Sequence, residues 1–173
     1  MQSEQPKQRW LGFHRAAVEI HAQNPAIDKE TFAKILAEKF GLRNWRNHYY
    51  AKDFQAKFSY SKTAGFSNCV VSLESIKNAD NLPLLVCLLR PTGVSTYLAN
   101  STFIKRVSYG SKKLTTSKII GTILGHDIMK KIGGIKNSPE NFEQLFQMHV
   151  GLSWKENLER IVAKTNPNKP QAV

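Results

Sequence analysis

The spacing of apolar residues predicts two helices near the start of the chain. Residues 9–23 repeat apolar side chains at helical intervals, and Pro25 closes that segment. Residues 28–40 repeat them again behind Asp28, a good N-cap residue. Gly41 then suits the left-handed position at which many helices end. We therefore expect a pair of N-terminal helices joined by a short turn.

A third helical pattern follows Gly41 directly and covers residues 42–58. Helix, glycine turn and helix form the outline of a helix-turn-helix, whose second helix points Arg and Asn side chains at base edges. Arg43, Arg46 and Asn47 are then the candidate base readers. The alternative is a plain helical hairpin with a basic outer face.

The middle of the chain has the patterns of strands. Leu84–Leu89 is uninterrupted aliphatic sequence between two prolines, which predicts a central strand covered on both faces. A short strand that turns helical near Leu73–Ile76 precedes it. Thr96–Ile104 and Ile119–Leu124 are the next expected strands, with a long excursion between them.

The carboxyl-terminal part returns to helical patterns. Ser138 is expected to cap one helix that Gly151 ends, and Ser153 with Glu156 forms a capping box for another. The apolar stripes of these two helices contain Phe142, Leu145, Phe146, His149, Trp154, Leu158, Ile161 and Val162.

Together these elements predict an α+β fold. N-terminal helices precede a central, mainly antiparallel sheet and two C-terminal helices. A helix-turn-helix is one arrangement of the N-terminal helices that the sequence allows. We expect one DNA-binding domain over 1–164, with a helical part at 1–58 and the sheet plus C-terminal helices at 66–164. Residues 165–173 have two prolines and no periodicity, and are expected to be a linker or tail.

A basic, hydroxyl-rich stretch supplies the main functional candidates. From Asn81 to His126 the chain has no Asp or Glu. Cations interleaved with small hydroxyl donors suit phosphate oxygens, whereas the alternative is a sheet edge guarded by lysines. The candidate phosphate ligands are Arg90, Lys105, Arg106, Lys112, Lys113 and Lys118, helped by Ser108, Tyr109 and Ser111.

The composition of the whole chain favours a polyanionic partner. Its 173 residues carry 25 Lys and Arg against 13 Asp and Glu, a formal net charge of +12. Such a balance favours DNA, RNA or an acidic membrane surface. RNA ranks lower than DNA because the paired aromatics of a sheet platform are missing, with only Tyr97 and Phe103 as candidates.

We expect no association with a membrane. No apolar run approaches the roughly 18 residues that a membrane span needs, and the first residues lack the apolar core of a signal peptide. Cys69 and Cys87 lie inside apolar runs, so they are expected to be buried hydrophobic residues in a reducing compartment. A cytoplasmic protein follows from these features.

The sequence predicts no catalytic site. Restriction-type nucleases place carboxylates and a Lys on adjacent strands, but the expected strands from Leu84 to Leu124 contain no carboxylate, and Glu74–Lys77 matches that pattern loosely. The alternative is a metal-dependent HNH-like endonuclease that uses His126, Asn141 and His149. Its departures are a swapped His–Asp order, a short last spacing and the lack of bracing CxxC pairs.

Several segments between Phe66 and Asn166 resemble the amino-terminal region of a group of bacterial type II restriction endonucleases. They are LANSTFIKRVSYGSKKL, GHDIM, SPENFEQLF and WKENLERIVAKTN. In that group the carboxylate-and-lysine motif lies in a later portion of the chain. The resemblance thus implies a part that reads the target DNA, with a Mg²⁺-dependent nuclease domain outside this chain.

The expected function is sequence-directed binding of double-stranded DNA as the recognition domain of a restriction endonuclease. We expect no catalytic residue, metal site or cofactor in this chain itself. A homodimer formed through the full-length protein is a further expectation.

Overall fold

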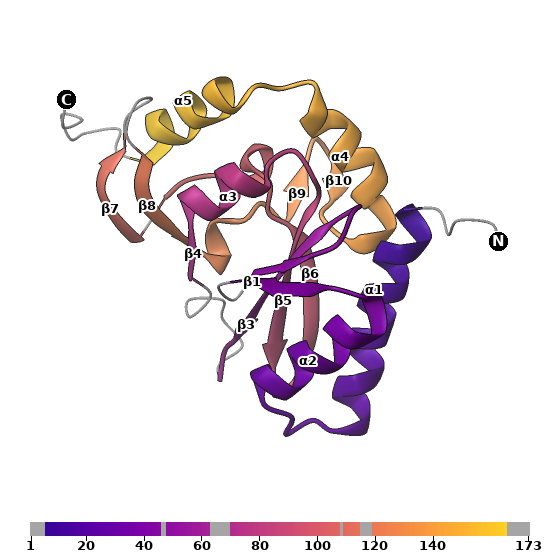
Figure 1. The fold of residues 1–173 in the computed structure, drawn as a ribbon. Coiled ribbons are helices and arrows are strands. Elements are labelled where there is room, and N and C mark those ends of the chain that lie inside the picture. The colour runs from indigo at the N-terminus through magenta and orange to yellow at the C-terminus, as the bar shows by residue number, and fades with distance from the viewer. Residues whose placement is uncertain (1–5, 46–47, 63–69, 108, 115–118, 166–173) are drawn as a thin grey trace.

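The computed structural model describes residues 6–45, 48–62, 70–107, 109–114 and 119–165 (Figure 1). The α-helices in these residues are α1 (Pro6–Gln23), α2 (Lys29–Phe40), α3 (Leu73–Ala79), α4 (Phe142–Val150) and α5 (Trp154–Thr165). Short 3-10 helices are η1 (Ser101–Phe103), η2 (Gly125–Asp127) and η3 (Pro139–Asn141). No helix within the described residues is long and apolar enough to cross a bilayer.

The strands form one large sheet and two smaller ones. They are β1 (Arg43–Trp45), β2 (His48–Tyr50), β3 (Gln55–Tyr60), β4 (Val70–Ser72), β5 (Leu84–Arg90), β6 (Gly93–Leu98), β7 (Tyr109–Leu114), β8 (Ile119–Leu124), β9 (Lys131–Ile132) and β10 (Ile135–Lys136). The large sheet has the order β1-β2-β3-β5-β6, the second β4-β8-β7, and β9 pairs with β10 alone. Every pair is antiparallel except β3 with β5, so the predicted α+β class with a mainly antiparallel sheet is confirmed.

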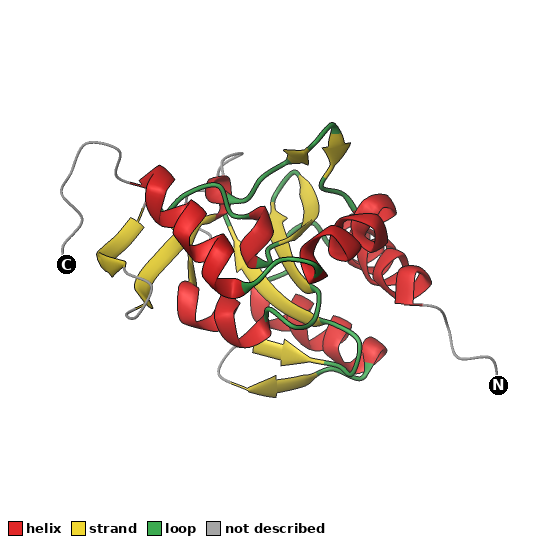
Figure 2. Ribbon diagram, turned by 90° about the horizontal axis from the view of Figure 1, so that it is seen from above, coloured by secondary structure: helices red, strands yellow, loops and turns green. Residues whose placement is uncertain are grey.

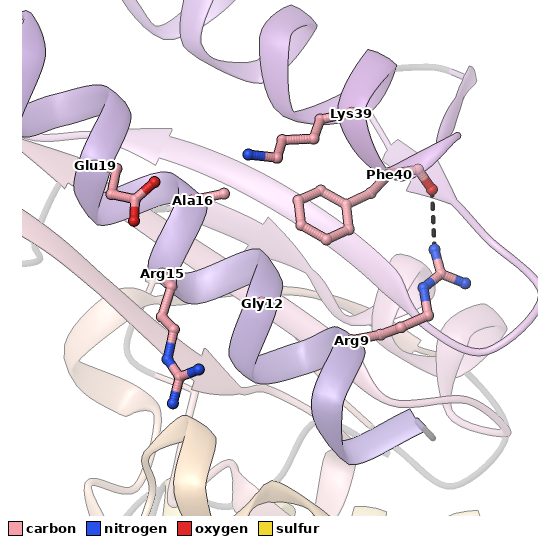
Figure 3. Close-up of a pocket in the computed structure, with 7 residues that line it drawn as sticks. All are labelled: Arg9, Gly12, Arg15, Ala16, Glu19, Lys39 and Phe40. Carbon is pink, nitrogen blue, oxygen red and sulfur yellow. Dashed lines mark hydrogen bonds between the residues drawn. The ribbon is translucent and has the colours of Figure 1, made fainter. Parts of the chain in front are cut away.

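Local capping chemistry sets the ends of α2, as the sequence predicts. The side chain of Asp28 accepts a hydrogen bond of 2.8 Å from the backbone N–H of Thr31, one of the donors that a helix start leaves unpaired. Gly41 ends the helix with φ 64°, a left-handed conformation that glycine adopts without strain. A groove separates α1 from α2 (Figure 3).

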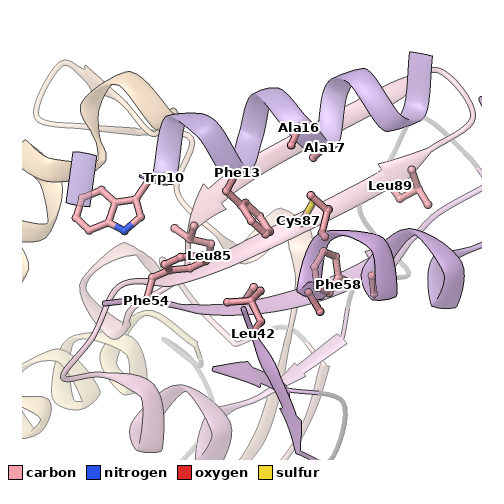
Figure 4. Packing of buried hydrophobic residues seen from close by; sticks show 14 of the residues in the cluster. Trp10, Phe13, Ala16, Ala17, Leu42, Phe54, Phe58, Leu85, Cys87 and Leu89 are labelled. Atoms are coloured by element: carbon pink, nitrogen blue, oxygen red, sulfur yellow. The ribbon is translucent and has the colours of Figure 1, made fainter. Parts of the chain in front are cut away.

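The first core cluster lies between α1, α2 and one face of the large sheet. Figure 4 shows Trp10 and Phe13 reaching from α1 toward the sheet. The Phe13 ring meets Phe54 edge-on, with 5.5 Å between ring centroids, a favoured aromatic geometry. From β5, Leu85, Cys87 and Leu89 join this cluster; burial raises the pKa of the Cys87 thiol to about 12. Cys69 lies outside the described residues.

The second core cluster lies on the opposite face of β5. Leu84, Val86 and Leu88 pack there with Ile76 of α3 and Ile161 of α5. Figure 2 shows helices on both sides of the central strands. Side chains of β5 thus alternate between two cores, which confirms the predicted central strand covered on both faces.

The predictions of a third N-terminal helix and of a helix-turn-helix are wrong. Residues 43–60 form β1, β2 and β3, so Arg43 stands on a strand and not on a recognition helix. The reason is tertiary pairing: β3 runs beside β5 over six residue pairs, from Gln55↔Leu84 to Tyr60↔Leu89. Phe54 and Phe58 are buried in that arrangement, which outweighs a helical spacing of apolar residues. The division at residue 58 is also wrong, because β1–β3 share a sheet with β5 and β6.

Two corrections apply to the segment that follows β6. The predicted strand Thr96–Ile104 ends at Leu98, because Asn100 turns the chain: its side chain accepts from the N–H of Leu84 at 3.1 Å and donates to the carbonyl of Leu82 at 2.8 Å. The predicted long excursion contains β7, which pairs with β8.

Candidate nucleic-acid interface

Two of the predicted phosphate ligands, Lys105 and Arg106, lie on the surface just after η1. The backbone N–H of Lys105 donates to the carbonyl of Asp127 at 2.9 Å, and Ile104 bridges Ile128 in antiparallel fashion. These contacts place both cations beside η2. Arg106 Nε lies 3.4 Å from Asp127 Oδ1, while about half of the Arg106 side chain (52%) stays exposed.

The carboxylate of Asp127 is internal, although it stands inside the basic region. Its side chain has no exposed surface. Oδ2 accepts from the backbone N–H of Leu124 at 2.9 Å, and His126 Nε2 lies 3.7 Å from Oδ1. Asp127 therefore holds the turn after β8 and presents no negative atom to an approaching anion.

A basic hairpin formed by β9 and β10 was missed by the sequence reasoning. Lys131 and Lys136 face each other across it and both are exposed. The turn residues are Gly133 and Gly134, with φ 55° and 84°, as a tight two-residue hairpin turn requires. Like charges directly opposite each other destabilise a hairpin, so Lys131 and Lys136 form a pair of cations that an anion would stabilise. The Gly-Gly pair between two isoleucines is the sequence signal that could have predicted it.

Asn137 anchors this hairpin to the large sheet. Its buried side chain accepts from the N–H of Leu98 at 2.9 Å and donates to the carbonyl oxygens of Leu98 and Met129 at 3.0 and 2.8 Å. A single side chain thereby replaces a missing strand partner at the end of β6.

We expect Asn137→Ala to lower the free energy of unfolding by about 2 kcal/mol, because it leaves buried backbone groups of Leu98 unpaired. Urea unfolding followed by circular dichroism measures this. Asn141→Ala is the matched control, since Asn141 Nδ2 makes one bond to the carbonyl of Lys136 in a solvent-exposed position. Equal losses in the two variants would contradict the anchoring role.

Some of the other predicted DNA-binding residues do not lie near Lys105 and Arg106. Arg43 is exposed on β1, at an edge of the large sheet. Arg90 is half-buried at the end of β5, where its Nη2 donates to Ser95 Oγ at 2.6 Å. Figure 1 shows β5 ending beside α2, away from β7 and β8. The structure therefore separates Arg90 from Lys105 and Arg106.

The remaining candidates are described in part or not at all. Tyr109, Ser111, Lys112 and Lys113 belong to β7, where the backbone pairs Tyr109 with Thr122 and Lys113 with Ile120 of β8. Their side chains, and residues Arg46, Asn47, Ser108 and Lys118, lie outside the described part of the chain. The strand β7 nonetheless runs through the middle of the acid-free stretch.

The groove between α1 and α2 has mixed charge. It has a volume of about 550 Å³. Arg9 on its wall is occupied, because it donates to Asp53 Oδ1 at 2.8 Å and to the carbonyl of Phe40 at 2.9 Å (Figure 3). Lys39 and the carboxylate of Glu19 are exposed along the same groove. With an exposed carboxylate among its cations, this groove suits a polyanion less well than the region around Lys105.

The HNH-like alternative gains no support from the surroundings of His149. This residue is buried, and both ring nitrogens are engaged, Nδ1 with Thr102 Oγ1 at 2.6 Å and Nε2 with the carbonyl of Asp80 at 2.7 Å. Neither nitrogen is left for a metal ion. The described residues contain no group of three or more His, Cys, Asp and Glu placed to hold one.

The half-buried His14 and the buried His48 make the stability of the fold depend on pH. Burial is the largest cause that lowers the pKa of His14 and His48 below the ordinary value of 6.5. The unfolded chain therefore binds more protons than the folded chain as the pH falls below 6.5. Neighbouring groups act in both directions. The charge of Glu140 raises and that of Arg15 lowers the pKa of His14, and the hydrogen bond with Gln55 raises and the charge of Lys57 lowers the pKa of His48, but burial outweighs them.

We expect the melting temperature to be highest above pH 6.5 and to fall as the pH drops from 6.5 through the lowered pKa values of the folded state. Melting curves at intervals between pH 5 and pH 8 measure this. The variant with both His14→Gln and His48→Gln should lose part of that dependence. An unchanged pH profile in the double variant would contradict the assignment.

The fold and the site together define an α+β domain with a basic surface beside η2. No family model, curated protein or solved structure that we compared matches this chain. A functional proposal therefore starts from the distribution of charge and from the geometry described above.

Proposed function

We propose that this protein binds double-stranded DNA in a sequence-directed manner, as the recognition domain of a type II restriction endonuclease whose nuclease domain lies outside this chain. The restriction part of the proposal rests on the resemblance of the segments LANSTFIKRVSYGSKKL, GHDIM, SPENFEQLF and WKENLERIVAKTN to that group. The DNA-binding part rests on charge.

The main observation in favour of DNA binding is the concentration of positive charge in one third of the chain. Residues 81–139 contain nine Lys and Arg and a single acid, Asp127, so they hold eight of the twelve net positive charges. That one acid is fully buried and bonded to the backbone. Among the described side chains Lys105, Arg106, Lys131 and Lys136 are exposed. Such an acid-free, cation-rich surface is what a phosphate backbone attracts.

The shape of the basic region favours duplex DNA. The β9–β10 hairpin is a two-stranded antiparallel ribbon, and the major groove of B-DNA admits a ribbon of this kind; β7 is an edge strand of the three-stranded sheet β4-β8-β7. In this proposal Lys105, Arg106 and the lysines of β7 and of the β9–β10 hairpin contact phosphates. Residues on strands then contact the bases, whereas the sequence predicted a recognition helix in that role.

A salt titration tests whether this protein binds DNA at all. Binding of the chain to a random-sequence duplex, to single-stranded DNA of equal length and to an RNA duplex is measured by fluorescence anisotropy without divalent metal. We expect the DNA duplex to bind most tightly, with a log affinity that falls linearly with log salt concentration. A preference for the RNA duplex, or no binding of any of the three at low salt, would overturn the proposal.

A further inference from the structure

A small cleft lies between the first two strands of the large sheet and α3, apart from the basic region. Its volume is about 230 Å³, below the roughly 300 Å³ at which sites for drug-sized ligands begin. The space therefore suits one ring system. Its lining residues are Trp45, His48, Tyr50, Gln55, Glu74, Ser75 and Asn78.

One wall of the cleft is aromatic. Trp45 pairs with His48 across β1 and β2, and Tyr50 stands two residues further along the same strand, so all three lie on one face. The rings of His48 and Tyr50 are 5.1 Å apart. Trp45 is 60% exposed, the highest exposure among the large hydrophobic residues for which exposure is described. An exposed indole beside a cleft is a stacking surface for a planar ligand.

The other walls offer hydrogen bonds of both kinds. Gln55 is 4% exposed, and its Oε1 pairs with His48 Nε2 at 2.9 Å. This bond takes the amide oxygen of Gln55, so its amide nitrogen is the group that can donate to a ligand. Glu74 and Asn78 stand one turn apart on α3 and are both exposed. A carboxylate and an amide there can meet the donors and acceptors on the edge of a heteroaromatic ring.

The charges around the cleft separate the two parts of a nucleotide. Glu74 inside the cleft repels a phosphate, whereas a neutral base meets no such penalty. Arg43 pairs with Tyr50 across β1 and β2, on the same face as Trp45, and is exposed. A phosphate beside that Arg would keep the sugar at the mouth of the cleft while the ring enters.

We propose that this cleft holds a single unstacked nucleobase of the bound DNA, with Trp45 stacking on the ring, Gln55 and Asn78 on its edge and Arg43 on the adjoining phosphate. The proposal rests on the DNA binding proposed above. It deepens that function because a base held outside the helix is read on its pairing edge.

Three duplexes of identical flanking sequence test the cleft. One is fully paired, one has a single bulged base, and one has an abasic residue in place of the bulged base. We expect the chain to bind the bulged base about tenfold more tightly than the abasic bulge, as stacking on an aromatic side chain predicts. Trp45→Ala should remove this preference, so that the variant binds the base bulge and the abasic bulge with equal affinity. Tyr60→Ala, which removes another exposed aromatic on the neighbouring β3, should keep it.

The outcomes separate the two proposals. Salt-dependent binding of the paired duplex, with equal affinity for the base and abasic bulges, would overturn the cleft proposal and leave the DNA-binding proposal standing. A preference that survives Trp45→Ala would overturn the cleft proposal as well. Failure to bind any of the three duplexes at low salt would overturn both. Circular dichroism of Trp45→Ala checks that the variant is folded, and Asn78→Ala, an exposed change on α3, gives a second test of the preference.

Discussion

Replacing Arg160 by Met is expected to lower the free energy of unfolding by about 3 kcal/mol. Arg160 stands on α5, and its guanidinium donates to three backbone carbonyls around η1. Nη1 bonds Ile104 at 2.9 Å, and Nη2 bonds Ser101 and Thr102 at 2.8 and 3.1 Å. Met retains much of the length of the side chain but removes the guanidinium donor from those three carbonyl oxygens.

The loss at Arg160 should be large because the surrounding polar network depends on the position of η1. Thr102 accepts from Asn157 Nδ2 at 3.2 Å and contacts His149, while Ser101 donates from its N–H and Oγ to the carboxylate of Asp80 at 2.9 and 2.7 Å. A shift of η1 disturbs all of these buried groups together.

Urea unfolding measures the effect of Arg160→Met, with Lys164→Met as the matched control. Lys164 is an exposed cation on the same helix, so its replacement tests the loss of charge and the gain of a methionine without the carbonyl bonds. A change of less than about 0.5 kcal/mol is expected for the control. Equal destabilisation by the two variants would contradict the role of Arg160 at η1.

Removing three exposed lysines, Lys105 beside η2 and Lys131 and Lys136 on the β9–β10 hairpin, is expected to weaken duplex DNA binding about 100-fold at moderate salt, with a salt slope shallower by about 2–3. The variant is Lys105→Ala, Lys131→Ala and Lys136→Ala. None of the three side chains is buried, so the fold should be retained. Each phosphate contact releases close to one counterion, which is the reason for the change in slope.

The matched control removes three exposed lysines elsewhere, Lys34→Ala, Lys39→Ala and Lys155→Ala. Both variants lose the same three charges from a net charge of +12. If binding follows net charge alone, the two variants weaken equally. If Lys105 and the β9–β10 hairpin form the interface, the control keeps most of its affinity and its salt slope. Equal weakening would therefore remove this region from the proposed interface.

Local chemistry made much of the fold predictable. The N-cap at Asp28, the left-handed Gly41 and the capping box of Ser153 with Glu156 depend on neighbours within four residues, and all are present in the structure. The aliphatic run that forms most of β5 was predictable because burial on both faces leaves no polar position between Leu84 and Leu89.

The errors lie where distant segments decide the structure. Residues 42–58 have apolar spacing that fits a helix, but pairing of β3 with β5 and burial of Phe54 and Phe58 favour strands. The helical interpretation also hides the aromatic face of Trp45, His48 and Tyr50, because that face forms only when side chains alternate along the paired strands β1 and β2.

The candidate interface was predictable in its charge but not in its arrangement. The absence of acids between Asn81 and His126 is visible in the sequence. The burial of Asp127, and the separation of β5, which ends at Arg90, from β7 and β8, depend on tertiary contacts.

A binding selection tests the central claim most directly. The chain is incubated with a pool of random-sequence duplex DNA at near-physiological salt without divalent metal, half of the pool being cytosine-methylated, and the retained molecules are sequenced. Sequence-directed recognition predicts a short motif enriched over the starting pool, and the two halves show whether methylation alters it. Retention without an enriched motif would contradict recognition and leave a binder of the phosphate backbone, and no retention would contradict DNA binding itself.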